Sequence, residues 1–250
     1  MRLYDKKKID WNNILFNNRA LFLLLVPIIV EQLLNSFMGM VDTMMVSTVG
    51  SEAISAVSLV DSFNNLVVQV FSAMAAGAAI ICSQYLGSGD ERAANNAARQ
   101  VVLTVAVIAL TVLLVCLLGR ERLLRFIFGE VEDGVMAGCL VYFLITVLSY
   151  PFLALFSVRA ALFRAGGNSR SPMKVSVISN ILNIAGNAVF IYVFRWSVAG
   201  AALATLISRV FSMAVIFYHL RKPRQVIVIR DYGQIRPDMP LVWKIMAIGI

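Results

Sequence analysis

Charged residues are scarce in this sequence. Of its 250 residues, 14% are charged and 60% are hydrophobic, and the mean hydropathy is +0.81. A soluble domain carries about a quarter charged residues, so the composition excludes an ordinary soluble protein. Histidine occurs once, at His219, and Cys82, Cys116 and Cys139 have no CxxC spacing. These patterns support neither a disulfide framework nor a zinc site.

Recognisable catalytic motifs are missing as well. The sequence has no nucleophile placed beside a base, no GxGD pair and no metal motif, so we predict that the protein is not an enzyme. The polar, basic amino terminus precedes an apolar run without a small-residue cleavage site, unlike a removable signal peptide. We therefore expect the first apolar run to remain as a membrane span.

Long apolar runs are what the sequence has in abundance. Six are long enough for the roughly 20 helical residues that cross a bilayer, at about 20–48, 53–82, 93–118, 134–163, 172–194 and 196–220. A further run begins at Leu241 and has ten residues. The pattern predicts an all-α integral membrane protein, with the chain as the front part of a longer one.

The domain division follows from these runs. Residues 1–18 are predicted as a cytoplasmic amino-terminal segment and 19–220 as a lobe of six transmembrane helices. Residues 221–240 are predicted as a cytoplasmic linker, and 241–250 as the start of a seventh, truncated transmembrane helix. We therefore expect most of the chain to lie in the lipid bilayer.

Basic residues lie at the ends of the apolar runs and give a net charge of +8. They do not follow one amphipathic face, so they indicate membrane topology rather than nucleic-acid binding. With the amino terminus inside, sixteen Lys and Arg residues fall on the cytoplasmic side, Arg159 and Arg164 among them. Four fall outside: Arg120, Arg122, Arg125 and Arg195. This imbalance predicts a multi-pass plasma-membrane protein with a cytoplasmic amino terminus.

Polar residues inside the spans gather on single helix faces. At about 100° per residue, one set in each of three spans falls within about 80°. The sets are Glu31, Asn35, Met38 and Asp42 in the first span, Asp61, Asn65, Gln69 and Ser72 in the second, and Ser176, Asn180, Asn183 and Asn187 in the fifth. We expect these spans to surround a polar interior, with the third and fourth outside. Pro27 predicts a bend in the first span, because proline removes a backbone hydrogen bond.

The carboxylates need an explanation that the amides do not. Asn, Gln and Ser join membrane helices by hydrogen bonds of about 0.6 kcal/mol each, whereas an ionised side chain in lipid costs at least a few kcal/mol. Asp42 is therefore the first candidate for a functional residue, and Asp61 and Glu31 follow. The alternative interpretation is that Asp42 has no functional role and that its side chain extends toward the outer membrane surface.

Depth along the helices indicates partners for the acids. Glu31 and Arg209 each lie eleven residues from the cytoplasmic end of their span, about 16 Å at about 1.5 Å per residue. We predict an ion pair between them. Asp42 and Asp61 both lie about 9 to 12 Å below the outer surface by the same rise. If these two face each other, their repulsion in a low dielectric favours proton uptake by one of them.

Four segments of the sequence occur in a characteristic order. They are "EQLLNSFMGMVDTMMV" after Pro27, "SQYLGSGDERAA", "RAGGNSRSPMKVSVISNILNIAGNAVFI" and "VAGAALATLISR". In this order and spacing they resemble the multidrug and toxic compound extrusion (MATE) transporters, from about residue 15 to the end. The resemblance implies the amino-terminal lobe of a twelve-helix transporter made of two six-helix lobes, with 221–240 as the linker between them.

The resemblance also implies roles for particular residues. A helix-one acid in the motif matched by "GMVDT" binds the coupling proton or sodium ion in that family, and Asp42 occupies this position. Asn183, Asn187 and Thr205 match polar residues that assist ion binding, and Pro27 matches a proline at which helix one bends. One departure is that some members have aspartate in place of Asn187, and the missing charge weakens the case for sodium.

Several polar residues are assigned by position alone. The candidates for cavity lining or proton relay are Glu31, Asn35, Asp61, Asn65, Gln69, Asn180 and Arg209. No cofactor is expected besides the coupling ion, H⁺ or Na⁺.

The expected function is cation-coupled antiport of small organic cations or drugs by alternating access, together with a carboxy-terminal lobe of the same chain. One alternative is a lipid-linked saccharide flippase of the wider superfamily, which needs a more cationic cavity than Arg209 alone indicates. Another is a membrane scaffold or half-transporter that does not transport.

Overall fold

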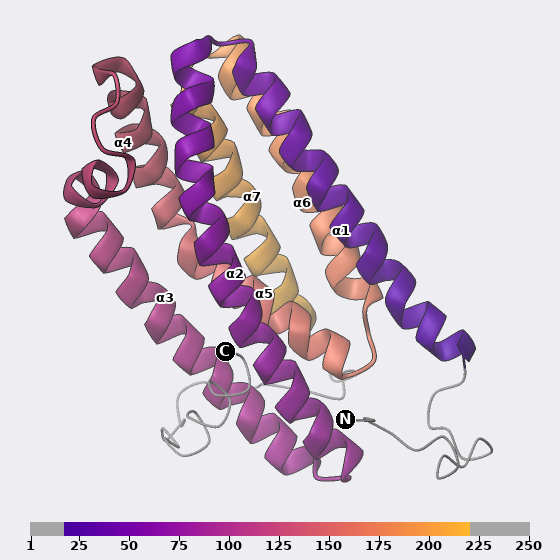
Figure 1. The fold of residues 1–250 in the computed structure, drawn as a ribbon. Helices are drawn as coiled ribbons and strands as arrows, with labels where there is room; N and C mark the ends of the chain where they lie inside the picture. Colours follow the sequence, from indigo (N-terminus) through magenta and orange to yellow (C-terminus); the bar gives the residue numbers. More distant parts are fainter. Residues whose placement is uncertain (1–17, 221–250) are drawn as a thin grey trace, which may run out of the picture.

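The computed structural model describes residues 18–220, which form a bundle of long helices (Figure 1). In chain order the helices are α1 (Asn18–Ser47), α2 (Ser51–Gly87), α3 (Glu91–Phe128), α4 (Asp133–Leu148), α5 (Tyr150–Ala165), α6 (Arg170–Asn187) and α7 (Ser197–Leu220). A π-helical turn, Ala188–Val193, extends α6. The predicted linker and the start of the seventh transmembrane helix lie outside the described residues, as does nearly all of the predicted amino-terminal segment.

Five of the helices are long and apolar enough to cross a membrane, and the bent pair α4–α5 makes a sixth candidate span. Within the described residues this confirms the predicted six-span lobe. The predicted fourth span, 134–163, is broken, because α4 and α5 meet at an angle of 44°. Pro151 lies in the first turn of α5. Its ring lacks a backbone N–H and crowds the preceding turn, which prevents a straight continuation of α4.

The turn between α2 and α3 has the punctuation expected of a helix boundary. Gly89 adopts a φ of +78°, a conformation that glycine reaches without a steric penalty. Asp90 follows as the N-cap of α3, and its Oδ1 accepts a hydrogen bond from the backbone nitrogen of Ala93 at 2.9 Å. The sequence "YLGSGDERAA" thus forms a capped turn.

Helix α2 lies in the middle of the bundle and packs against α3, α4 and α5. Small side chains such as Ala56, Ala78 and Ala97 are fully buried there. Small residues let membrane helices approach closely. At Gly138 of α4 an added Cβ atom would lie 2.9 Å from the Ala56 Cβ. The second and fourth predicted spans are therefore in intimate contact.

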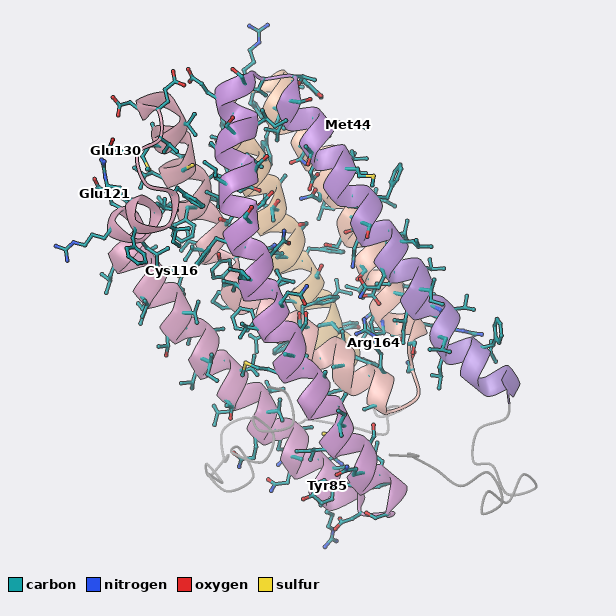
Figure 2. All side chains as sticks on the ribbon, viewed as in Figure 1. Met44, Tyr85, Cys116, Glu121, Glu130 and Arg164 are labelled. Atoms are coloured by element: carbon teal, nitrogen blue, oxygen red, sulfur yellow. The ribbon has the colours of Figure 1, made fainter. Side chains whose placement is uncertain are left out.

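Helix α1 packs mainly against α6, and α6 packs against α7 (Figure 1). The outward face of α1 is apolar, with Leu33, Phe37, Met40 and Met44 exposed. Figure 2 shows Met44 directed away from the bundle. The polar stripe of α1 therefore faces inward. Helix α1 runs through Pro27 as one helix, and the bend expected there stays a prediction.

Arg159 differs from its predicted placement. The count of basic residues assigns it to the cytoplasmic side, whereas its side chain is fully buried within α5. Its guanidinium carbon lies 3.0 Å from the centre of the Phe217 ring on α7. A cation over an aromatic face is a stabilising contact between helices. Arg159 is thus a packing residue rather than a topology signal at the membrane surface.

Candidate functional site

Helices α1 and α6 are joined by polar side chains at a constant spacing. Three hydrogen bonds link residues that lie 145 positions apart in the chain. They run from Ser176 Oγ to Glu31 Oε1 (2.8 Å), from Asn180 Nδ2 to Asn35 Oδ1 (3.1 Å), and from Asn187 Nδ2 to Asp42 Oδ1 (2.6 Å). The constant separation means that the helices are parallel and in register. We call these three contacts the polar ladder.

Glu31, at one end of the ladder, is paired with a different arginine from the predicted one. Arg164 Nη2 lies 2.7 Å from Glu31 Oε2, and Glu31 is 4% exposed. Figure 2 places Arg164 at the carboxyl end of α5. The predicted pair between Glu31 and Arg209 is wrong. Depth along a helix fixes the height of a side chain but not the direction in which it projects, and Arg209 Nη1 instead donates to Ser149 Oγ at 2.6 Å.

Asp42, at the other end of the ladder, receives two amide hydrogen bonds on Oδ1. One comes from Asn187 Nδ2 at 2.6 Å. The other comes from Asn183 at 2.9 Å, when its amide is oriented so that its oxygen accepts from Thr205 Oγ1 at 3.3 Å. The structure therefore brings together Asp42, Asn183, Asn187 and Thr205, from α1, α6 and α7.

The side-chain oxygen of Asn187 stands out among the polar atoms beside Asp42. Asn187 Oδ1 is buried and has no hydrogen-bond partner among the described residues. Buried acceptors are nearly always paired, so an unpaired oxygen marks a place where a donor or a cation fits.

Asp61, on α2, is the centre of a second polar cluster. Its Oδ1 accepts hydrogen bonds from Asn64 Nδ2 at 3.0 Å and from Tyr142 OH at 3.1 Å. The Tyr150 hydroxyl donates to Asn64 Oδ1 at 2.6 Å. Tyr142 lies on α4 and Tyr150 on α5. The fourth predicted span therefore contributes to the polar interior, and the expectation that it packs outside is wrong.

A cavity of about 550 Å³ lies between the two clusters. Its walls come from α1, α2, α4, α5, α6 and α7, and both Asp42 and Asp61 line it. Asn65 is also among the lining residues, whereas Gln69 is not and is exposed. The third helix, α3, lies at the edge of the bundle (Figure 1) and contributes none of the described lining residues.

Three charged side chains line this cavity within the described residues: Asp42, Asp61 and Arg209. The Arg209 guanidinium attracts both carboxylates electrostatically. Glu31 is not a lining residue, and its charge is matched by Arg164. The cavity thus holds two acids and one base.

Several members of these clusters were missed from the sequence. Asn64 lies three residues after Asp61, a spacing at which side chains on a helix are neighbours, so the sequence contained a usable signal for it. The hydroxyl groups of Tyr142 and Tyr150 gave no such signal, because their rings fit an apolar run. The sequence did contain a signal for the break at Ser149. Pro151 follows two residues later, and a proline there indicates a helix boundary.

Spanning helices that enclose amide and charged side chains around a cavity define a multi-pass helical membrane protein with a polar interior. The family model described as MatE matches residues 27–189. The chain therefore belongs to the MatE family, and the resemblance seen in the sequence motifs is confirmed.

Relatives of known name agree with this assignment. The chain is 32% identical over 212 residues to the uncharacterized transporter YisQ of Bacillus subtilis, a match that covers 83% of this chain and 46% of YisQ. It is 26% identical over 235 residues to the probable multidrug resistance protein NorM of Thermotoga maritima, covering 92% and 50%. The chain spans about half the length of these relatives.

Solved structures show the same fold. A MOP superfamily transporter from Pyrococcus furiosus superposes with a TM-score of 0.86 at 22% sequence identity, over 92% of this chain and 51% of that one. A multidrug resistance MATE family transporter in an outward-facing conformation gives the same TM-score and coverage. The described helices thus adopt the fold of half of such a transporter.

Proposed function

We propose that the protein is a cation-coupled antiporter that exports small organic cations by alternating access, with this chain as its amino-terminal lobe. A proton or a sodium ion supplies the driving force. The amino terminus lies on the cytoplasmic side of the plasma membrane. Relatives named for multidrug resistance and multidrug export support the transport function, and the excess of Lys and Arg on one side of the spans supports the orientation.

The observation that carries the proposal is the setting of Asp42. The carboxylate lines the cavity, and neutral amides hold its Oδ1. An ionised carboxylate away from bulk water is costly unless a cation or a proton neutralises it. Asp42 is therefore suited to bind a mobile positive charge, which is what a coupling site must do.

Both coupling ions fit the groups around Asp42. A proton makes one carboxyl oxygen a donor, and rotation of the Asn187 amide then presents Oδ1 as its acceptor. A sodium ion, as a hard cation, takes oxygen ligands, which Asp42, Asn187 and Thr205 can provide. In either case the amide of Asn187 changes from donor to acceptor. One monovalent ion neutralises the site, because Asn187 itself carries no charge.

Exchange follows if the ion and the substrate stabilise different states of the transporter. A ligand with equal affinity for both states moves nothing, so the two must differ in which state they favour. An organic cation enters from the cytoplasm while Asp42 is ionised. Arrival of the coupling ion from outside neutralises Asp42 and favours release of the substrate. The second lobe closes the pathway on the opposite side.

The test is efflux of ethidium from vesicles that contain the full-length protein, with proton and sodium gradients imposed separately. We expect one gradient to drive efflux in the wild type and Asp42→Asn to abolish it at unchanged protein abundance. Asp90→Asn is the matched control, because Asp90 caps α3 in a turn and asparagine is an equally good cap. Full gradient-driven efflux by Asp42→Asn would contradict the proposal.

A further inference from the structure

The charges that line the cavity do not balance. Asp42 and Asp61 contribute two negative charges and Arg209 contributes one positive charge, so the described lining has a net charge of −1 when both acids are ionised. Glu31 does not alter this sum, because it is outside the lining and pairs with Arg164 at 2.7 Å. Tyr142 and Tyr150 add no charge to this sum, because their hydroxyl groups act as hydrogen-bond donors to Asp61 Oδ1 and Asn64 Oδ1.

Arg209 is a fixed member of this set. Its Nη1 donates to Ser149 Oγ at 2.6 Å, and Ser149 is fully buried at the break between α4 and α5. A guanidinium group does not lose its proton in proteins, whereas a carboxylate can gain one. The positive charge of Arg209 is thus permanent, and it cannot leave the cavity as an ion does.

We infer that Arg209 is a resident counter-ion that limits the cavity to one additional positive charge and makes it selective for monovalent over divalent organic cations. The inference rests on the proposed function, since it names the substrate class of the same cavity. A monovalent cation brings the lining to neutrality. A divalent cation leaves one charge uncompensated in a low dielectric, where such a charge is costly.

The same limit governs the exchange of ion and substrate. A coupling ion at Asp42 uses the single negative charge that the substrate also needs. The two cations therefore compete for one charge, even where they do not occupy the same position. Competition of this kind yields exchange rather than joint transport.

Ethidium and propidium provide a matched pair of probes. They share a phenanthridinium ring system, but ethidium carries one positive charge and propidium two. Their dissociation constants are measured by fluorescence with the full-length protein in nanodiscs, in alkaline buffer. We expect the wild type to bind ethidium at least about tenfold more tightly than propidium.

Arg209→Met is expected to lower that preference at least about tenfold, because the two carboxylates then accommodate both charges of propidium. Arg209→Lys keeps the charge and should keep the preference. Arg125→Met is the matched control, since Arg125 lies at the surface in a pair with Glu121 at 3.3 Å. It should bind both dyes as the wild type does.

A double variant separates the effect of the cavity's charge on dye preference from the effect of its shape. Asp61→Asn combined with Arg209→Met returns the net charge of the lining to −1 and should restore the preference for ethidium. A change caused only by the altered shape of the cavity is not reversed in this way. Size-exclusion chromatography and circular dichroism verify that each variant is folded.

An unchanged preference in Arg209→Met, or no recovery in the double variant, would overturn the inference. If Arg209→Met does not fold, Asp61→Asn alone decides, because its neutral lining should weaken ethidium binding at least about tenfold; unchanged affinity would refute the counter-ion role. Failure of the proposed function looks different: the wild type would bind neither dye, or Asp42→Asn would retain gradient-driven efflux.

Discussion

The buried pair between Glu31 and Arg164 yields a quantitative prediction for the stability of the lobe. Glu31 is 4% exposed and takes hydrogen bonds from Arg164 at 2.7 Å and Ser176 at 2.8 Å. Replacing Arg164 by methionine leaves the carboxylate unpaired, which costs about 3–5 kcal/mol in fully buried pairs. The Arg164 side chain is 30% exposed, so water reaches part of the site. We therefore expect Arg164→Met to lower the free energy of unfolding by about 3 kcal/mol.

A double-mutant cycle isolates the ion pair. Glu31→Gln keeps the shape of the side chain and an acceptor for Ser176, so it should cost about 1 kcal/mol. In that background Arg164→Met no longer strands a charge, and its cost should fall to about 1 kcal/mol. The expected coupling energy between Glu31 and Arg164 is thus about 2 kcal/mol.

The assay is equilibrium unfolding of the full-length protein in mixed micelles of increasing SDS content, followed by far-ultraviolet circular dichroism. Arg125→Met serves as the control and should change stability by less than about 0.5 kcal/mol, because its pair with Glu121 is exposed. Additive effects of the Glu31 and Arg164 substitutions would refute the reasoning. Coupling of Glu31 to Arg209 instead would favour the pair expected from depth alone.

Two further predictions use the same assay. Gly200→Ala should destabilise the lobe by about 1–3 kcal/mol, because the added Cβ would lie 2.9 Å from Phe190 Cβ and 3.1 Å from the Phe190 carbonyl carbon. Gly119→Ala is the control: its added Cβ would meet no atom within 4 Å, so it should be neutral or stabilising. Tyr150→Phe should cost about 1–3 kcal/mol by leaving the buried Asn64 Oδ1 unpaired; no loss would mean that water replaces the hydroxyl.

Helical periodicity predicted the composition of the polar ladder but not its register. The spacing of Glu31, Asn35 and Asp42 placed all three on one face, and the partners on α6 were found in the same way. Which residue of one helix meets which residue of the other depends on how the helices pack. The hydrogen bond of 2.6 Å between Asn187 and Asp42 is an example of a pairing that periodicity alone does not specify.

The Asp61 cluster was harder to predict for a different reason. Tyr142 and Tyr150 lie on the two sides of the 44° bend in the fourth span, and both bring a hydroxyl group to the interior. A hydropathy profile treats that span as one apolar run and gives no direction to a hydroxyl group. Arg164 was likewise assigned to the membrane surface, since a charge near the end of a run fits a topology signal equally well. Long-range packing, rather than local sequence, selects between these roles.

The polar ladder also sets the order in which the lobe is completed during synthesis. Each ladder residue of α6 leaves the ribosome 145 residues after its partner on α1. At about 5–20 residues per second, this separation corresponds to roughly 7–30 s. Throughout that interval Glu31 and Asp42 lack their α6 partners while α2 to α5 are being made. Helix α1 is therefore among the last of the described helices to be fixed, and the insertion machinery must tolerate its two unmatched acids until Arg164 of α5 reaches Glu31 and α6 reaches Asp42.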